Sequence, residues 1–353
     1  MTRRRSAIVA IALSLGLVLG ACGGDSSPTA TEDDTGQGEG GGEGFTVSVS
    51  MDAIEVPEEV TGGVVKVTLE SDLEEAEANL TKVASGTTED QFKQAISQLV
   101  AGGPIPDFVE ATTGILGREG GGATSTLVLP EGDYIAWSIP EPPEGEEGGD
   151  GGGEGEEPTP STSTTTAAAA AETARSQEEA PEGEGEGEGE GGPGGGGPPP
   201  EAVRTAKFTV RPGEAADLPD ADGNSITARD YSFDVKVAAG AKEVVFRNEG
   251  PDQLHHFVLF NFGKTEPSVV EENLPAFLES EEDAPPPPAF KDVNFDNLQA
   301  GDGPVLTPGL GATAATNAFE SGNTYVAACF IQDRTGGPPH AIAKGMRTVF
   351  TVE

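Results

Sequence analysis

The chain of 353 residues carries a formal net charge of −41 at pH 7, from 61 acidic and 20 basic side chains. Proteins that bind nucleic acids neutralise phosphates with clustered basic residues, so a charge of this sign argues against nucleic acid as a partner. Glycine contributes 51 residues and aromatic residues only 5% of the chain. This composition indicates that part of the sequence cannot bury enough apolar surface to fold.

The N-terminal segment is predicted to be a lipoprotein signal peptide over residues 1–22. Three arginines, Arg3 to Arg5, precede an apolar run over 7–19 that is too short for an ordinary transmembrane helix. The run ends in LGACG, which resembles a bacterial lipobox and implies that Cys22 becomes an acylated N-terminal residue. An ordinary signal-peptidase site is the alternative. The anchor would hold the remaining chain on the extracytoplasmic face of a bacterial cell membrane, with membrane lipid as its partner.

Two segments of low complexity are predicted to be disordered. Residues 23–44 are dominated by Gly, Thr and acidic residues and read as a flexible tether. Residues 141–200 contain acidic Gly/Glu repeats and runs of proline. We interpret this second segment as an insertion before the last strand of a first domain, because the cost of closing a loop grows only slowly with its length. The alternative is an interdomain linker, in which case the strand at 204–210 would open the second domain.

The ordered regions on either side of this insertion resemble each other, since 62–89 aligns with 239–266 without a gap. Each aligned region contains two short alternating strands, predicted at 65–69 and 80–83 in the first and at 243–246 and 257–260 in the second. A helix follows in both regions. Thr88 is the expected N-cap of the first helix, with Gln91 three residues later, and Pro267 occupies the first turn of the second.

The later parts of the two regions also match: 127–138 with 319–329, and 204–210 with 347–352. Short strands separated by Gly, Pro, Asn and Asp turns are typical of Greek-key sandwiches. We therefore predict an all-β fold of two β-sandwich domains, 45–211 and 212–353, each with one short inserted helix.

The rarest side chains of the sequence form a candidate metal site near its end. The chain has three His, two Cys and three Met. If Cys22 is acylated, Cys329 is the only thiol left, and it lacks a disulfide partner. It could be a buried residue that acts as a small hydrophobe. A thiolate, two imidazoles and a thioether are, however, the ligands of a blue-copper site. Only one of the adjacent His255 and His256 can face such a site, because residues alternate along a strand.

The C-terminal region, 225–353, resembles the cupredoxin family of plastocyanin and azurin. The resemblance rests on YSFD and VVFRN upstream, on HHFV at 255–258, and on the GxYxxxC…H…GM…V pattern over 322–352. It implies one copper ion bound by His255, Cys329 and His340, with Met346 as a weak axial ligand and His256 as the alternative to His255. The ten residues 330–339 between Cys329 and His340 exceed the family spacing. They either bulge out and return His340 to the site or displace it.

The first region has no His or Cys after the signal segment, and Ala78 and Ser138 align with His255 and Cys329. It is therefore predicted to be a degenerate cupredoxin-like domain. No hydrolase triad, HExxH motif or phosphate-binding loop is present, so we do not expect an enzyme. The predicted function is a lipid-anchored copper protein that passes single electrons to an extracytoplasmic redox protein, or holds copper. The alternative is a scaffold of two sandwiches without metal.

Overall fold

The computed structural model describes residues 42–73, 76–116, 122–140, 198–214, 216–280 and 285–353. Cys22 with its signal segment, the predicted tether up to residue 41 and nearly all of the predicted insertion 141–200 lie outside these residues. The described residues belong to one unit, formed by the chain before residue 142 and after residue 195. None of the described helices is long and apolar enough to cross a membrane.

Strands dominate the described chain, which confirms the predicted all-β class. The first half contains β1 (Gly42–Val49), β2 (Ile54–Glu55), β3 (Glu59–Thr61), β4 (Gly63–Ser71), β5 (Glu77–Val83), α1 (Glu89–Val100), β6 (Val109–Leu116), β7 (Gly122–Leu129), β8 (Gly132–Ser138) and, after a 3-10 helix (Pro200–Ala202), β9 (Arg204–Arg211). Because β1 begins at Gly42, the prediction that the tether extends to residue 44 is wrong at its last residues.

The second half has a similar series of elements. It contains β10 (Ser225–Arg229), β11 (Ser232–Lys236), β12 (Glu243–Asn248), β13 (Val258–Asn261), α2 (Pro267–Leu278), β14 (Gln299–Asp302), β15 (Gly311–Ala315), β16 (Thr324–Ala328), α3 (His340–Ala343) and β17 (Arg347–Thr351), with 3-10 helices at Ala221–Gly223, Pro288–Phe290 and Phe295–Asn297. The short helix α3 begins at a predicted metal ligand, and nothing in the sequence predicted it.

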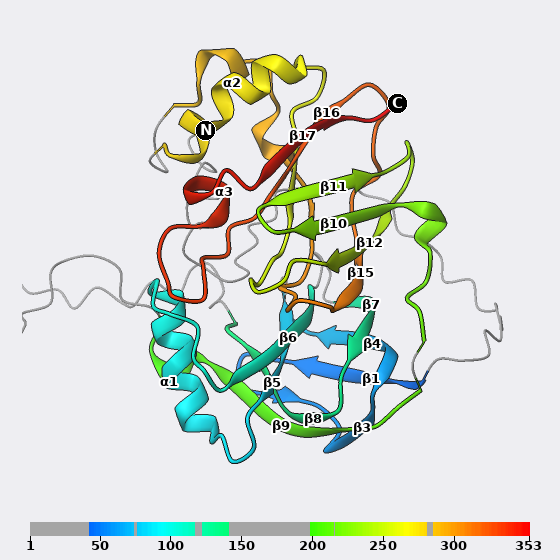
Figure 1. Ribbon diagram of the computed structural model, residues 1–353, viewed down its shortest axis with the longest axis vertical. Coiled ribbons are helices and arrows are strands. Elements are labelled where there is room, and N and C mark those ends of the chain that lie inside the picture. Colours follow the sequence, from blue (N-terminus) through cyan, green and yellow to red (C-terminus); the bar gives the residue numbers. More distant parts are fainter. Residues whose placement is uncertain (1–41, 74–75, 117–121, 141–197, 215, 281–284) are drawn as a thin grey trace, which may run out of the picture. The chain divides into compact units, whose positions relative to one another are not determined.

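The two halves share the same strand order. In the first half the sheets run β7-β4-β1-β2 and β9-β8-β5-β6, and in the second they run β15-β12-β10-β11 and β17-β16-β13-β14. The pairs β1–β4 and β10–β12 are parallel, and the other neighbours in these orders are antiparallel. An antiparallel bridge between Leu127 and Ala312 joins two of the sheets into one of eight strands (Figure 1).

Strand β9 pairs with β8 along its whole length, from Arg204 opposite Ser138 to Val210 opposite Gly132. The segment after the insertion therefore completes a sheet of the first half and does not open the second. A parallel pair with β3 covers its other edge.

Both predicted helices form where their sequences indicate. Thr88 caps α1: its hydroxyl accepts a hydrogen bond from the Gln91 amide at 3.2 Å, and the Gln91 side chain accepts one from the Thr88 amide at 3.0 Å. This capping box satisfies two amides that the first helical turn leaves free. In α2, Pro267 occupies the first turn, where its missing N–H costs no hydrogen bond.

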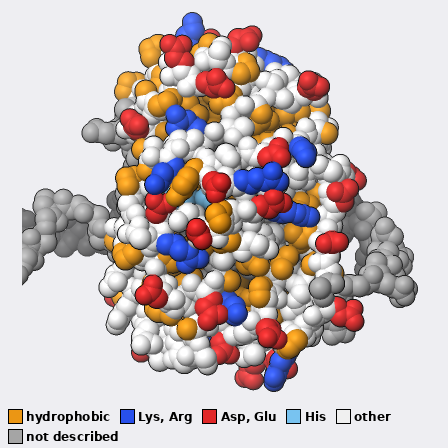
Figure 2. All heavy atoms as spheres, in the orientation of Figure 1, with side chains coloured by type: hydrophobic (Ala, Val, Ile, Leu, Met, Phe, Trp, Pro, Cys, Tyr) orange, Lys and Arg blue, Asp and Glu red, His pale blue; other side chains and the backbone are white. Residues whose placement is uncertain are grey.

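The hydrophobic core lies between the facing sheets of each half and draws residues from both. Trp137 of β8 and Phe246 of β12 are almost fully buried, and Phe246 packs edge-on against Phe257 at 4.9 Å between ring centroids. On the outside, the face shown in Figure 2 mixes basic and acidic side chains without a large patch of either sign. The excess of acidic residues in the chain is therefore not concentrated on this face.

Candidate metal centre

Strand pairing in the second half brings the predicted ligands to one end of a sheet. β13 and β16 are antiparallel, with Val258 opposite Ala328, so residues just before β13 lie beside residues just after β16. His255 and Cys329 occupy these two places. On the other side of β16, the Cys329 amide donates a hydrogen bond to the Met346 carbonyl at 3.2 Å. Strand register thus brings the segments that carry three of the four predicted ligands to the same end of the sheet.

His340 is returned to this end by hydrogen bonds at the base of its loop. The His340 amide donates to the Ile331 carbonyl at 2.8 Å, and the Ala341 amide donates to the Cys329 carbonyl at 2.7 Å. The residues between them bulge outward while both ends of the loop stay together. Of the two alternatives that the sequence left open, the structure shows the bulge that brings His340 back.

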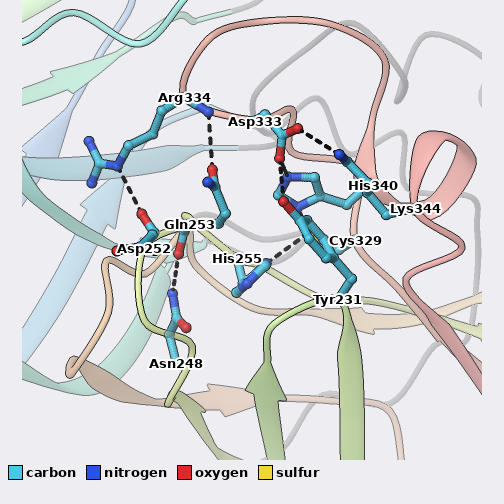
Figure 3. A network of polar contacts seen from close by, with 10 residues as sticks. All are labelled: Tyr231, Asn248, Asp252, Gln253, His255, Cys329, Asp333, Arg334, His340 and Lys344. Atoms are coloured by element: carbon cyan, nitrogen blue, oxygen red, sulfur yellow. Dashed lines mark hydrogen bonds and ion pairs between the residues drawn. The ribbon is translucent and has the colours of Figure 1, made fainter.

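Three side chains converge into one group that could hold a metal ion. The Cys329 sulfur lies 3.9 Å from Nδ1 of His255 and 3.6 Å from Nδ1 of His340. The three candidate ligand atoms all lie within 4.8 Å of one another, and all three residues are fully buried (Figure 3). One thiol and two imidazole nitrogens at these separations fit a single ion with sulfur and nitrogen ligands.

The other two sequence candidates have different surroundings. His256 lies outside the converging group, because its Nε2 accepts a hydrogen bond from the Phe330 amide at 2.7 Å. Met346 is fully buried, and its amide donates to the His340 carbonyl at 3.0 Å. The backbone of Met346 is therefore tied to both Cys329 and His340. Its role as an axial ligand stays a prediction.

Burial controls the charge of the three converging groups. It raises the pKa of the Cys329 thiol to about 12, although the amides of His256 and Ile331 donate hydrogen bonds that act in the opposite direction. The two amides would stabilise a thiolate once a metal displaced the proton. Burial and the nearby His340 lower the pKa of His255 to about 4, and burial also lowers the pKa of His340. Both imidazoles are therefore neutral at pH 7, as metal ligands must be.

Asp333 orients one of these imidazoles. Its Oδ1 lies 3.1 Å from Nε2 of His340 and accepts a hydrogen bond from the Tyr231 hydroxyl at 2.8 Å. Its Oδ2 forms an ion pair with Lys344 at 3.1 Å (Figure 3). A carboxylate at Nε2 holds the proton there, which leaves the lone pair on Nδ1 facing the sulfur. Partial burial raises the pKa of Asp333, but the hydrogen bonds from Tyr231, Lys344 and His340 outweigh this, so the carboxylate stays ionised.

Sequence reasoning missed this network. Asp333 lies inside the ten residues 330–339 that were seen only as an excess of length. Tyr231 belongs to the YSFD motif but was given no role, and its ring packs edge-on against His340 at 5.1 Å between centroids. A carboxylate between two ligands in the sequence was the one available signal.

A second network fixes His255 from behind. Nδ2 of the fully buried Asn248 donates to the Gln253 carbonyl at 2.8 Å and to the Leu306 carbonyl at 2.7 Å. Gln253 in turn accepts a hydrogen bond from the Arg334 amide at 3.1 Å through its side chain. The segment that carries His255 is therefore linked to the loop that carries Asp333.

The corresponding end of the first half lacks these chemical groups. Ala78 and Ser138, which align with His255 and Cys329, are both 1% exposed. Within the described ranges, the His255–Cys329–His340 group is the only cluster of potential metal ligands. The first half therefore has no matching site among its described residues.

Comparison with known proteins gives matches only at the level of structure. No family model and no curated protein matches the chain. Among solved structures, dithionite-reduced auracyanin from Roseiflexus castenholzii is 25% identical, over 36% of this chain and 94% of that chain, with a TM-score of 0.22. Auracyanin A, a "blue" copper protein from Chloroflexus aurantiacus, is 19% identical over 36% and 96%, with a TM-score of 0.21. The copper nitrite reductase NirK from Thermus scotoductus is 10% identical over 88% and 62%, with a TM-score of 0.16.

Proposed function

We propose that the protein is a cupredoxin-type copper protein that binds one copper ion through His255, Cys329 and His340, with Met346 as the axial ligand. The observation that carries this proposal is the convergence of one sulfur and two imidazole nitrogens within 4.8 Å of one another in a fully buried position. The ligands come from segments far apart in the chain, so their meeting is a property of the fold and not of a local turn.

The chemistry of the donor set favours copper over other metals. Thiolate and thioether sulfur favour Cu(I), and imidazole suits both oxidation states of copper. A structural zinc site would instead be closed by four Cys and His ligands. Among the described residues, the converging group offers only three such ligands. Copper supplies a one-electron redox couple when it is bound, and the protein holds the ligands in place.

Between electron transfer and copper holding, the geometry supports electron transfer. Exchange of copper needs ligands that solvent or a partner can reach, yet all three converging ligands are fully buried. The His340 imidazole is also held by Asp333, and the backbone of His255 is held by Leu306. Ligands held in this way change their positions little between the two oxidation states, and this suits rapid exchange of single electrons.

The lipid anchor is a separate part of the proposal. We infer from the lipobox resemblance that Cys22 is acylated and that the protein acts on the extracytoplasmic face of a bacterial membrane. A redox protein in that compartment would then be its partner. Replacement of Cys22 by serine should move the protein from the membrane fraction to the soluble extracytoplasmic fraction, and retention in the membrane would contradict acylation.

Copper titration tests the metal centre directly. Purified full-length protein is titrated with Cu(II), desalted, and examined by visible absorption and metal analysis. The proposal expects an intense thiolate-to-copper band and one retained copper per chain. Cys329→Ser should abolish the band, and His256→Gln should keep it because His256 lies outside the ligand group. Wild-type protein that retains no copper after desalting would overturn the proposal.

A further inference from the structure

Two of the three converging ligands lie outside the strand ladders of the second half. His255 forms an isolated bridge with Leu306, and His340 begins the short helix α3 after a long loop. Only Cys329 directly follows a strand that is paired on both sides. The positions of the two imidazoles therefore depend on contacts that strand pairing does not supply.

The first half contacts the loop that carries Asp333. The side-chain amide of Gln332 donates a hydrogen bond to the Gly103 carbonyl. The Ile105 amide donates to the Arg334 carbonyl at 2.9 Å. These two contacts lie immediately on either side of Asp333, whose carboxylate holds Nε2 of His340.

The same loop approaches the first half closely at Gly336. A Cβ atom at this position would lie 3.3 Å from the Gly102 carbonyl oxygen and 3.5 Å from the Pro104 nitrogen. The backbone of Gly336 has φ +85°, a conformation that side chains other than glycine rarely adopt. The residues that lengthen the Cys329–His340 interval are thus the residues that reach the first half.

The first half also contacts the segment that holds His255. The Thr112 amide of β6 donates to the Thr307 hydroxyl at 2.9 Å, and the Thr307 amide donates back to the Thr112 carbonyl at 3.2 Å. The next residue, Leu306, exchanges two backbone hydrogen bonds with His255, at 2.8 Å and 3.1 Å. Thr307 therefore links β6 of the first half to Leu306, which holds the backbone of the ligand His255.

From these contacts we propose that the ligand-free first half is a positioning domain for the metal centre in the second half. It holds Thr307 behind His255 and holds the Asp333 loop behind His340. This inference rests on the proposed function for its purpose, but the restraint itself is present without metal. Weakening the contacts should loosen the two imidazoles and expose Cys329, although no substituted residue touches the ligand atoms.

The chain offers a matched control for this proposal. Thr313 of β15 accepts a hydrogen bond from the Thr126 amide at 2.9 Å, which is the same chemistry between the same two halves as the Thr112–Thr307 contact. Thr313 lies within a strand paired with β12 and has no ligand or ligand partner as a neighbour. Thr307→Val and Thr313→Val each remove one hydroxyl acceptor between the two halves. They differ because Thr307 is next to Leu306, the backbone partner of His255, whereas Thr313 has no such neighbour.

The test uses the full chain with Cys22→Ser, in which Cys329 is the only thiol. The metal-free protein is treated with 5,5′-dithiobis(2-nitrobenzoate), and the rate of Cys329 modification is measured. Thr307→Val and Gln332→Leu should each raise this rate roughly fivefold, the factor expected when one hydrogen bond no longer opposes local opening. Thr313→Val should leave the rate within about twofold of the parent. Thr307→Ser keeps the hydroxyl and should react at the rate of the parent.

A second readout separates this inference from the copper proposal. The rate of copper loss to excess EDTA should rise in Thr307→Val and Gln332→Leu and stay unchanged in Thr313→Val. Equal thiol rates in all variants, or equal increases in all three, would overturn the positioning role. If the thiol rates follow the expected order but the parent binds no copper, the positioning role stands and the copper function fails.

Discussion

If the proposed centre binds copper, the charge of Asp333 should shift its reduction potential. Asp333→Asn removes the negative charge but keeps a side-chain oxygen that can accept from the Tyr231 hydroxyl, now 2.8 Å away. The same oxygen lies 3.1 Å from Nε2 of His340, so the imidazole can keep its orientation. A carboxylate stabilises the more positive, oxidised centre, and its loss should therefore raise the potential.

The size of the shift follows from the geometry. The carboxylate lies one imidazole ring away from the ligand nitrogen of His340, so roughly 7 Å separates it from a charge held by the ligands. At an effective dielectric constant of about 20–40, that separation corresponds to about 1.2–2.4 kcal/mol. Since about 1.4 kcal/mol equals about 59 mV for a one-electron couple, the potential should rise by roughly 50–100 mV.

Spectroelectrochemical titration of the blue band measures this shift. Lys344→Met is the control of opposite sign, because Lys344 pairs with the same carboxylate at 3.1 Å. It should lower the potential by less, since its side chain is 38% exposed and solvent screens it more. An Asp333→Asn potential equal to or below that of the parent, with an unchanged absorption spectrum, would refute the electrostatic role of Asp333.

Three further predictions concern stability, each measured by urea unfolding of the metal-free protein. Burial lowers the pKa of His256 from 6.5 to about 3, so the unfolded chain binds a proton there that the folded chain does not. His256 alone should therefore cost about 2 kcal/mol of stability when the pH falls from above 6.5 to 5, in addition to the losses from the buried His255 and His340. His256→Gln should reduce the pH dependence of stability by one proton. Phe277→Ala, which removes a buried ring packed on Phe262 and Phe290, should cost about 3–5 kcal/mol, whereas Phe277→Leu should cost much less. Thr88→Ala breaks the capping box of α1 and should cost about 1 kcal/mol, and an unchanged unfolding midpoint would contradict that role.

Much of the fold was readable from local sequence patterns. Alternating apolar residues marked β4, β5 and β12, and the pairing of Thr88 with Gln91 marked the start of α1. The predicted tether extended to residue 44 and so overlapped the start of β1 at Gly42, because the glycines at 42 and 44 resemble a tether in composition. Composition alone cannot show that this segment pairs with β4 over 65–71.

The candidate site was predictable only in part. His255, Cys329 and His340 could be chosen because His and Cys are rare and follow a family order. His255 was chosen over His256 because the family pattern places the ligand first. The expectation that only one of them faces the site rested on strand alternation, whereas the structure holds His255 in an isolated bridge to Leu306. Asp333 and the contacts from Gly103 and Thr112 could not be predicted. They join residues far apart in the chain, and several of them use backbone groups, which every residue carries.

These contacts suggest a role for the first half, which lacks the ligand residues. A centre that exchanges single electrons needs ligands whose positions stay fixed, and strand pairing in the second half fixes only Cys329. His255 and His340 are held by Asn248, by Asp333 and, behind these, by backbone and hydroxyl groups of the first half. With Ala78 and Ser138 buried where ligands would stand, the first half can bind no competing ion there. In the proposed arrangement, the second half carries the metal ion, and the first half, which contacts the long loop and Thr307, holds two of the ligands in place.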